Sequence, residues 1–311
     1  MSQLREITSG LKFPEGPVAM NDGSVLVVEI TGGTLTRVRP NGAKEVVANT
    51  GGGPNGAALG PDGKVYICNN GGLRFTADGS PTEGLPDGYT GGYIQRVDID
   101  SGKVEVLYTE CNGHRLRGPN DLVFDAQGGF WFSDFGKVLE RQRDRTALYY
   151  AKADGSSIKE VVFPIDGPNG IGLAPGDTHL YAAQTFEGRV WQWKIAAPGE
   201  LAPVEVGEGG PLLAGPGGGK LLAGLPGYQL LDSLAVDSAG NVCVATLING
   251  GITVISPDGA SVEFVPTGDP LTTNICFGGP DLRTAYITLS GSGRLVAVDW
   301  PRPGLKLHYS R

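Results

Sequence analysis

The hydrophobic positions of this chain fall in short runs separated by glycine and turn residues. Runs of Val, Ile, Leu and Tyr have the length of single β-strands, and Asp-Gly turns at 22–23 and 62–63 separate two pairs of them. Apolar runs joined by Asp-Gly are typical of β-hairpins. The 3.6-residue periodicity of a long amphipathic helix is hard to find. The pattern therefore predicts an all-β chain of short antiparallel strands.

One stretch of this pattern occurs six times. Each copy has a polar residue, a small or apolar run, a turn with Gly or Pro-Asp, and a second strand. The copies are FPEGPVAMNDG, GGGPNGAALGPDG, RGPNDLVFDAQGG, IDGPNGIGLAPGD, LLDSLAVDSAG and TTNICFGGPD. A third strand follows every copy and a fourth follows most, with a period of about 52 residues. We predict one domain, 1–311, folded as a six-bladed β-propeller with four antiparallel strands per blade. The closing strand could come from either end of the chain.

The polar residue that opens each copy stands at the mouth of the predicted innermost strand. Because the blades are related by rotation about the channel, these residues are expected to meet at one end of it. They are Glu15, Asn55, Asn120, Asn169, Asp232 and Asn274. Carboxylate and amide oxygens suit Ca²⁺, Mg²⁺ or Mn²⁺, and two carboxylates balance one divalent ion. Two simpler interpretations stay open: the residues cap strands and turns, or an ion merely plugs the channel.

A divalent ion in an open pocket could polarise a carbonyl or phosphoryl oxygen and activate water. Asp232 is the candidate base, because the sequence LDS places a hydroxyl beside it. A serine triad is not supported, since GxSxG does not occur. GxxxxGK[ST] and a GxGxxG that opens a helix are also missing. The three histidines, His114, His179 and His308, lack the spacing of a zinc site.

Composition and charge narrow the class of protein. Lys and Arg total 25 against 33 for Asp and Glu, and the net charge of −8 disfavours nucleic acid or an anionic membrane as partner. No apolar stretch is long enough to span a bilayer, and the first residues lack a secretion segment, so we expect a cytoplasmic protein. The four cysteines never form CxxC and are expected to be reduced. We expect a small-molecule partner and a monomer or weak oligomer.

Long connections are predicted to reach the rim on the side of the polar residues. They begin at Gly71 and Phe135, and a Gly/Pro-rich insert runs from Gly207 to Gly227. Long ordered loops are often functional, so these segments could form a lid. Arg117 is the candidate to bind a polyol or carboxylate, and the simpler interpretation is a solvated surface charge.

The motifs FPEGP, GPND, GPNG, LDSLAVDSAGNV and NICFGGPDLRTAYIT, in this order, resemble those of the senescence marker protein-30/gluconolactonase/luciferin-regenerating enzyme-like family. The resemblance covers essentially the whole chain. It implies a six-bladed propeller that holds one divalent cation and hydrolyses sugar lactones. Ca²⁺ is the first expectation for the ion, and Zn²⁺, Mg²⁺, Mn²⁺ and Fe²⁺ are alternatives.

The resemblance also implies roles for single residues. Glu15, Asn169 and Asp232 match metal ligands, and Asp232 also matches the base. Asn120 matches either a ligand or a substrate contact. Many members carry an arginine two residues before that Asn, where this chain has Gly118. Similarly, a Glu-Thr pair of many members is Gln184–Thr185 here, which indicates a different substrate.

Together these observations predict a carboxylic ester hydrolase of carbohydrate metabolism that opens a sugar lactone to the hydroxy acid. The expected metal ligands are Glu15, Asn120, Asn169 and Asp232, with Asn274 as a further member of the ring. Asn55, Arg117 and Asn120 are expected to orient the substrate. Two alternatives are a phosphotriester hydrolase similar to diisopropyl fluorophosphatase, and a non-catalytic calcium-binding propeller.

Overall fold

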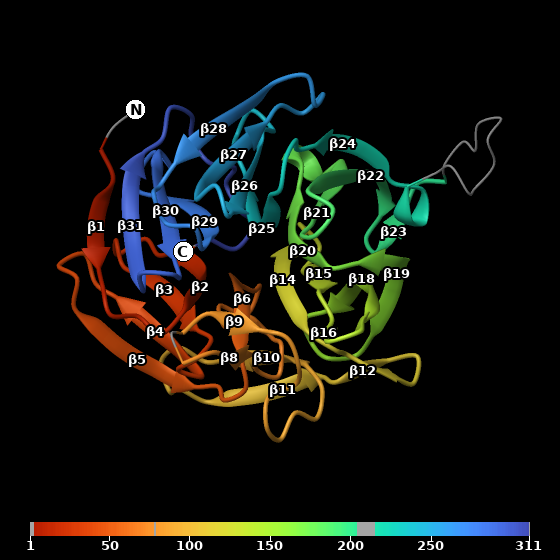
Figure 1. Ribbon diagram of the computed structural model, residues 1–311, viewed down its shortest axis with the longest axis horizontal. Helices are drawn as coiled ribbons and strands as arrows, with labels where there is room; N and C mark the ends of the chain where they lie inside the picture. The colour runs from red at the N-terminus through yellow and green to blue at the C-terminus, as the bar shows by residue number, and fades with distance from the viewer. Residues whose placement is uncertain (1–2, 78, 204–214, 311) are drawn as a thin grey trace.

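The computed structural model describes residues 3–77, 79–203 and 215–310. Six antiparallel sheets stand around a central channel like the blades of a propeller (Figure 1). The innermost strands of neighbouring blades contact one another around the whole circle. The predicted fold class, all-β with six four-stranded blades, is therefore confirmed.

The first three blades are listed here from the innermost strand outward. Blade 1 contains β2 (Pro14–Ala19), β3 (Val25–Glu29), β4 (Thr34–Val38) and β5 (Lys44–Asn49). Blade 2 contains β6 (Pro54–Leu59), β7 (Val65–Asn69), β10 (Tyr93–Val97) and β11 (Val104–Tyr108). Blade 3 contains β14 (Pro119–Phe124), β15 (Gly129–Asp134), β18 (Arg145–Lys152) and β19 (Ile158–Asp166).

The other three blades follow the same order. Blade 4 contains β20 (Pro168–Leu173), β21 (His179–Gln184), β22 (Arg189–Ala197) and β24 (Lys220–Gly224). Blade 5 contains β25 (Leu230–Val236), β26 (Val242–Leu247), β27 (Gly251–Ile255) and β28 (Val262–Pro266). Blade 6 contains β29 (Thr272–Gly278), β30 (Thr284–Leu289), β31 (Arg294–Asp299) and β1 (Arg5–Thr8).

Two features of the chain path were not fixed by the sequence pattern. The ring is closed by the N-terminal strand β1, which pairs with β31, so blade 6 combines both ends of the chain. The insert predicted as a rim loop, 207–227, is in part the outer strand β24 of blade 4, which corrects that prediction. Residues 207–214 of this insert lie outside the described residues.

The core lies between the blades, because each blade packs its two faces against its neighbours. Second strands are therefore buried on both faces, as in β3 and β15, and read as nearly continuous apolar runs. Outer strands such as β5 and β28 are mostly exposed. Between blades 2 and 3 the core is aromatic, with Tyr66 edge-on to Phe124 at 4.9 Å between centroids.

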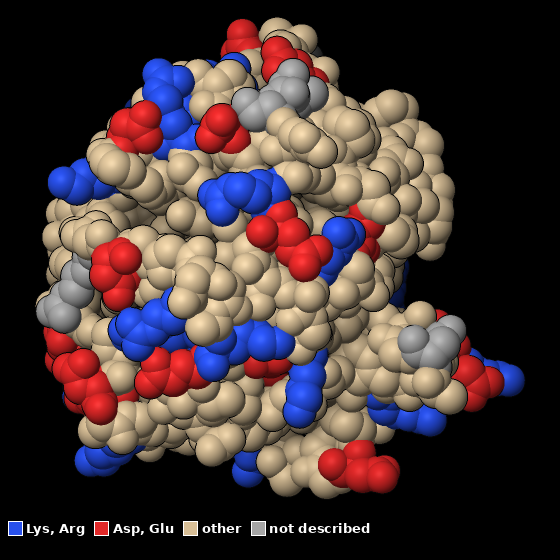
Figure 2. Space-filling model, turned by 90° about the vertical axis from the view of Figure 1, so that its left-hand side faces the viewer, with Lys and Arg blue, Asp and Glu red and all other residues tan. Residues whose placement is uncertain are grey.

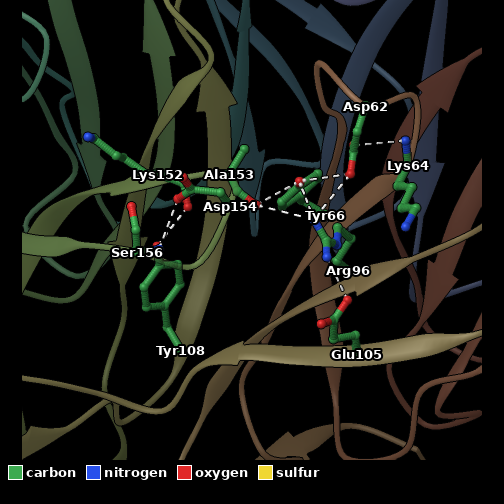
Figure 3. Close-up of polar contacts among 10 residues, drawn as sticks. All are labelled: Asp62, Lys64, Tyr66, Arg96, Glu105, Tyr108, Lys152, Ala153, Asp154 and Ser156. Atoms are coloured by element: carbon green, nitrogen blue, oxygen red, sulfur yellow. Dashed lines mark hydrogen bonds and ion pairs between the residues drawn. The ribbon is translucent and has the colours of Figure 1, made fainter.

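Polar contacts fasten blades 2 and 3 at the end where their inner strands finish (Figure 3). The hydroxyl of Tyr66 donates to Ala153 O at 2.9 Å, and that of Tyr108 donates to Lys152 O at 2.7 Å. Arg96 Nη1 donates to Ala153 O at 3.5 Å, and within blade 2 it pairs with Glu105 at 2.6 Å. The contacts to Ala153 and Lys152 connect two consecutive blades through residues that are 87 and 44 positions apart in sequence.

Short hairpins decorate the connections: β8 (Arg74–Phe75) with β9 (Pro81–Thr82), β12 (Glu110–Cys111) with β13 (His114–Arg115), and β16 (Val138–Leu139) with β17 (Gln142–Arg143). A further strand, β23 (Glu200–Leu201), pairs with β22, and 3₁₀ turns occur at Pro175–Asp177 and Pro216–Gly218. Within the described residues no helix is long and apolar enough to cross a membrane.

Acidic and basic side chains lie side by side on the face shown in Figure 2. Exposed ion pairs of the chain include Arg39 with Glu45 and Arg294 with Glu6. The four cysteines are free thiols, as predicted, and three of them are buried.

Candidate functional site

The six predicted polar residues stand at the same place in every blade. Each inner strand begins one or two positions before the polar residue, and its pairing with the second strand shifts register there. Such bulges turn side chains out of the regular alternation and are common beside active sites. We call this end of the channel the ring end, and the six residues the ring.

Glycines let the inner strands approach closely just below the ring. Gly16 has φ +51°, and a Cβ there would lie 2.5 Å from Asn55 O. A Cβ on Gly170 would lie 2.6–2.7 Å from backbone atoms of blade 5, next to Asp232. A larger residue at either position would separate adjacent blades. The close packing therefore explains why the FPEG and GPNG motifs contain glycine at these positions.

Glu15 and Asp232 are the two carboxylates of the ring, and both are buried. Glu15 Oε2 accepts hydrogen bonds from Asn274 Nδ2 and from Gly16 N, both at 2.8 Å. Burial raises the pKa of Glu15 well above its usual value, and the neighbouring Asp232 raises it further. Burial raises the pKa of Asp232 to about 7, opposed by the Asn169 amide beside it. The two carboxylates are buried and repel each other when both are charged, so a cation between them would be favourable.

The amides of the ring differ in what their oxygens do. Among the described residues, no donor reaches the buried Oδ1 of Asn55, Asn120 or Asn169. In contrast, Asn274 Oδ1 accepts from Ile275 N at 2.7 Å. A buried amide oxygen without a partner costs free energy unless something else satisfies it. Three such oxygens beside two carboxylates fit a hard divalent cation, whereas strand-capping side chains would be hydrogen-bonded.

The donor set argues for an oxygen-liganded ion. In the described part of the chain no three His, Cys, Asp or Glu side chains group together as metal ligands. An ion at the ring would therefore be held through amide oxygens as well as Glu15 and Asp232. Amide and carboxylate oxygens suit Ca²⁺ or Mg²⁺ better than a soft metal.

Asp121 is a third carboxylate that the sequence reasoning passed over. It is buried under the ring, accepts from Leu122 N at 2.9 Å, and burial raises its pKa to about 7. Its charge raises the pKa of both Glu15 and Asp232. The signal was in the sequence: GPND is the one Pro-Asn-containing copy with a carboxylate where the others have glycine.

The sequence LDS led us to expect the hydroxyl of Ser233 beside Asp232, the candidate base. The hydroxyl of Ser233 is buried beside Asp121 and acts to lower the pKa of that carboxyl. Below it, the inner strands enclose an apolar cavity of about 130 Å³ lined by residues such as Val18, Leu122 and Leu234.

Arg117 reaches the rim at the ring end, as predicted, but its guanidinium is engaged. Nε donates to Asp144 Oδ2 at 2.8 Å, and Cζ lies 5.5 Å from the centre of the Tyr89 ring. Its side chain is 37% exposed. A role in substrate binding stays a prediction, with Tyr89 and Asp144 as additional partners that the sequence did not indicate.

Gln184 and Thr185 support the ring from blade 4. Thr185 Oγ1 accepts from Asn169 Nδ2 at 3.2 Å, which aims Oδ1 of that amide away from Thr185. Gln184 accepts from Trp191 Nε1 at 2.5 Å and donates to Asp166 O. The Gln184–Thr185 pair therefore orients a ring residue, and Gln184 is bound to backbone and Trp191.

Comparison with known proteins adds to this geometry. The family model described as SMP-30/Gluconolactonase/LRE-like region matches residues 13–291. A gluconolactonase from Zymomonas mobilis is 25% identical, over 92% of this chain and 79% of its own length. A diisopropyl-fluorophosphatase from Loligo vulgaris is 24% identical, over 68% of this chain and 66% of its own length.

Among solved structures, a calcium-binding protein from Agrobacterium tumefaciens, regucalcin, superposes with a TM-score of 0.71. It is 17% identical, and the match covers 100% of this chain and 96% of the other. At that identity the likeness concerns the fold alone.

Proposed function

The chain belongs to the SMP-30/gluconolactonase/LRE-like family, and from that premise we propose that it is a divalent-metal-dependent lactonase acting on sugar lactones. Relatives with gluconolactonase and lactonase activity support lactone hydrolysis as the reaction. The observation that carries the metal is the pair of unsatisfied amide oxygens of Asn120 and Asn169 beside two carboxylates. Calcium is the proposed ion, because the donors are hard oxygens.

Glu15, Asn120, Asn169 and Asp232 would hold the ion, and Asn274 would keep Glu15 in place through its hydrogen bond. When bound, such an ion polarises a carbonyl oxygen and lowers the pKa of water. Asp232 takes a proton from the attacking water, whose oxygen bonds to the lactone carbonyl carbon. The ring C–O bond then breaks, and the proton passes to the leaving alkoxide to give the hydroxy acid. Asn55 and Arg117 orient the sugar hydroxyls.

The test is acid release in a pH-indicator assay with glucono-, galactono-, xylono- and arabinono-lactone. Chelated protein is compared with protein given each divalent ion in turn. We expect release that requires metal and disappears in Asp232→Asn. Metal binding without acid release from any lactone would contradict the proposal.

A second candidate is phosphotriester hydrolysis, favoured by the diisopropyl-fluorophosphatase among the relatives. The same assay with a fluorophosphate substrate separates the two activities by their kcat/KM. A non-catalytic calcium-binding propeller would turn over neither substrate, and Asp232→Asn would then change ion affinity alone.

A further inference from the structure

Two rim loops interlock over one side of the ring. The described residues of loop 70–92 of blade 2 (70–77 and 79–92) and loop 135–144 of blade 3 both lie at the ring end. Gly84 N donates to Val138 O at 2.8 Å, and Tyr89 Oη donates to Arg117 O at 2.5 Å. Lys137 Nζ donates to Gly72 O at 2.7 Å. Hydrogen bonds therefore join the blade 2 loop and the blade 3 loop into one continuous segment of the rim.

On the blade 2 side, hydrogen bonds connect Gly72 to a ring residue. Gly72 N donates to Asn70 Oδ1 at 2.8 Å, and Asn70 N donates to Gly53 O at 2.8 Å. Gly53 and Gly72 are in close contact, since a Cβ on Gly53 would lie 2.8 Å from Gly72 Cα. Gly53 is two residues before Asn55, whose amide oxygen has no partner among the described residues. A shift of Gly72 would therefore be passed through Asn70 and Gly53 to Asn55.

On the blade 3 side, two carboxylates organise the backbone that leads to Asn120. Asp134 accepts from the backbone N–H groups of Arg117 at 2.7 Å and Gly118 at 2.6 Å. Asp144 Oδ2 accepts from Arg117 Nε at 2.8 Å and from Lys137 N at 3.0 Å. Gly118 is two residues before Asn120. The backbone of Lys137 belongs to this second network.

Lys137 joins the two networks, because its backbone is bound on the blade 3 side and its ammonium on the blade 2 side. The residue is 4% exposed, and Nζ lies 5.0 Å from the centre of the Tyr89 ring. Burial lowers its pKa to about 8, while Asp134 and Asp144 act to keep it charged. A buried ammonium costs free energy that an apolar residue of the same length would avoid. We therefore expect the charged ammonium group of Lys137 to have a function at this position.

We infer that Lys137 is a positioning residue that fixes Asn55 and Asn120 relative to each other by tying the blade 2 loop to the blade 3 loop. It contacts neither amide and acts through Gly72 and the backbone of 117–118. The inference rests on the proposed function for its effect on catalysis, but its structural effect can be measured without any substrate. Residues that orient ligands of a metal commonly change affinity by about 10–100-fold when removed.

The test compares Lys137→Met, which keeps the apolar length, with Lys137→Arg, which keeps the charge. Lys159→Met, at an exposed lysine of blade 3, is the matched control. Calcium binding to chelated protein is measured by calorimetry, and amide hydrogen exchange of 69–73 and 117–120 is measured without metal. We expect Lys137→Met to bind calcium about 10-fold more weakly and to exchange faster in both segments. Lys137→Arg should recover most of both properties, and Lys159→Met should match the wild type.

With a lactone, Lys137→Met should raise KM more than it lowers kcat, since Asp232 is untouched. Unchanged calcium affinity and exchange in a folded Lys137→Met would overturn the inference. If that variant does not fold, Lys137→Gln, which keeps a donor without the charge, is used with the same criteria. If the wild type opens no lactone, the proposed function fails, and the exchange measurement still decides the role of Lys137.

Discussion

The two ends of the central channel are built from the same six inner strands, yet one end buries polar groups and the other is apolar. At the ring end, Glu15 and Asp232 are buried together, and three amide oxygens have no partner among the described residues. At the opposite end, the C-terminal segment 305–310 lines an apolar cavity. There, His308 Nε2 lies 2.9 Å from the carboxylate of Asp177.

This difference between the two ends indicates that the ring end is the candidate ligand-binding end of the channel. The cavity end follows ordinary packing, with Tyr309 edge-on to Phe124 at 5.7 Å between centroids. The ring end departs from packing rules at the first positions of the inner strands, which are also the bulged positions. Departures of this kind are expected at functional sites and are offset by the rest of the fold.

The largest effect should come from Asp232→Asn. The change removes the proposed base and one of two carboxylates, so lactone turnover should fall by about 10³-fold or more. The measurement is kcat with saturating calcium and the best lactone. A variant that keeps more than a tenth of wild-type kcat would remove Asp232 from the mechanism.

Next in size is the loss of metal affinity when an unsatisfied oxygen is removed. Asn169→Ala deletes one such oxygen, and calcium should bind about 10–100-fold more weakly in calorimetry. Thr185→Val, which removes the partner of the Asn169 amide but leaves its oxygen, is the milder companion. Equal affinity in Asn169→Ala and wild type would show that this oxygen is not a ligand.

The carboxylates of the ring should also make the metal-free protein sensitive to pH. Burial raises the pKa of Asp232 to about 7, above the value of about 4 in an unfolded chain. Between these two values the folded protein binds more protons at this carboxyl, so the contribution of Asp232 to stability is fully present below about pH 4 and is lost as pH rises through about 7. Chelated protein should be less stable at pH 8 than at pH 5.5 by about 2–4 kcal/mol in urea unfolding.

Calcium should remove most of this pH dependence, because the ion takes the place of the protons. Asp232→Asn should likewise stabilise the metal-free protein at pH 8 while it abolishes turnover. A chelated protein equally stable at both pH values would contradict the picture of repelling carboxylates.

The smallest effect on function is expected at the cavity end. Tyr309→Ala removes an aromatic contact and should lower the free energy of unfolding by about 1–2 kcal/mol, with kcat/KM within about twofold of wild type. Thermal unfolding and the lactone assay on the same preparation test both statements. A tenfold loss of kcat/KM would mean that the two ends are coupled.

The sequence predicted the blades and the ring because both depend on a repeated local pattern. Glu15 and Asn169 could be placed from their motifs, since equal registers in related blades meet at the axis. The closing strand β1 and the outer strand β24 could not, because either depends on pairing between distant segments rather than on local spacing. Lys137 was missed for the same reason: its partner Gly72 is 65 residues away and belongs to another blade.

The central claim is that the ring binds one divalent cation through Glu15, Asp232 and unsatisfied amide oxygens. Calorimetric titration of calcium into chelated protein at pH 7.5, beside Glu15→Gln, tests it most directly. The account predicts one site per chain in the wild type and binding at least about 10-fold weaker in the variant. A wild type that binds neither calcium nor any other divalent ion, or a Glu15→Gln variant that binds as tightly, would contradict it.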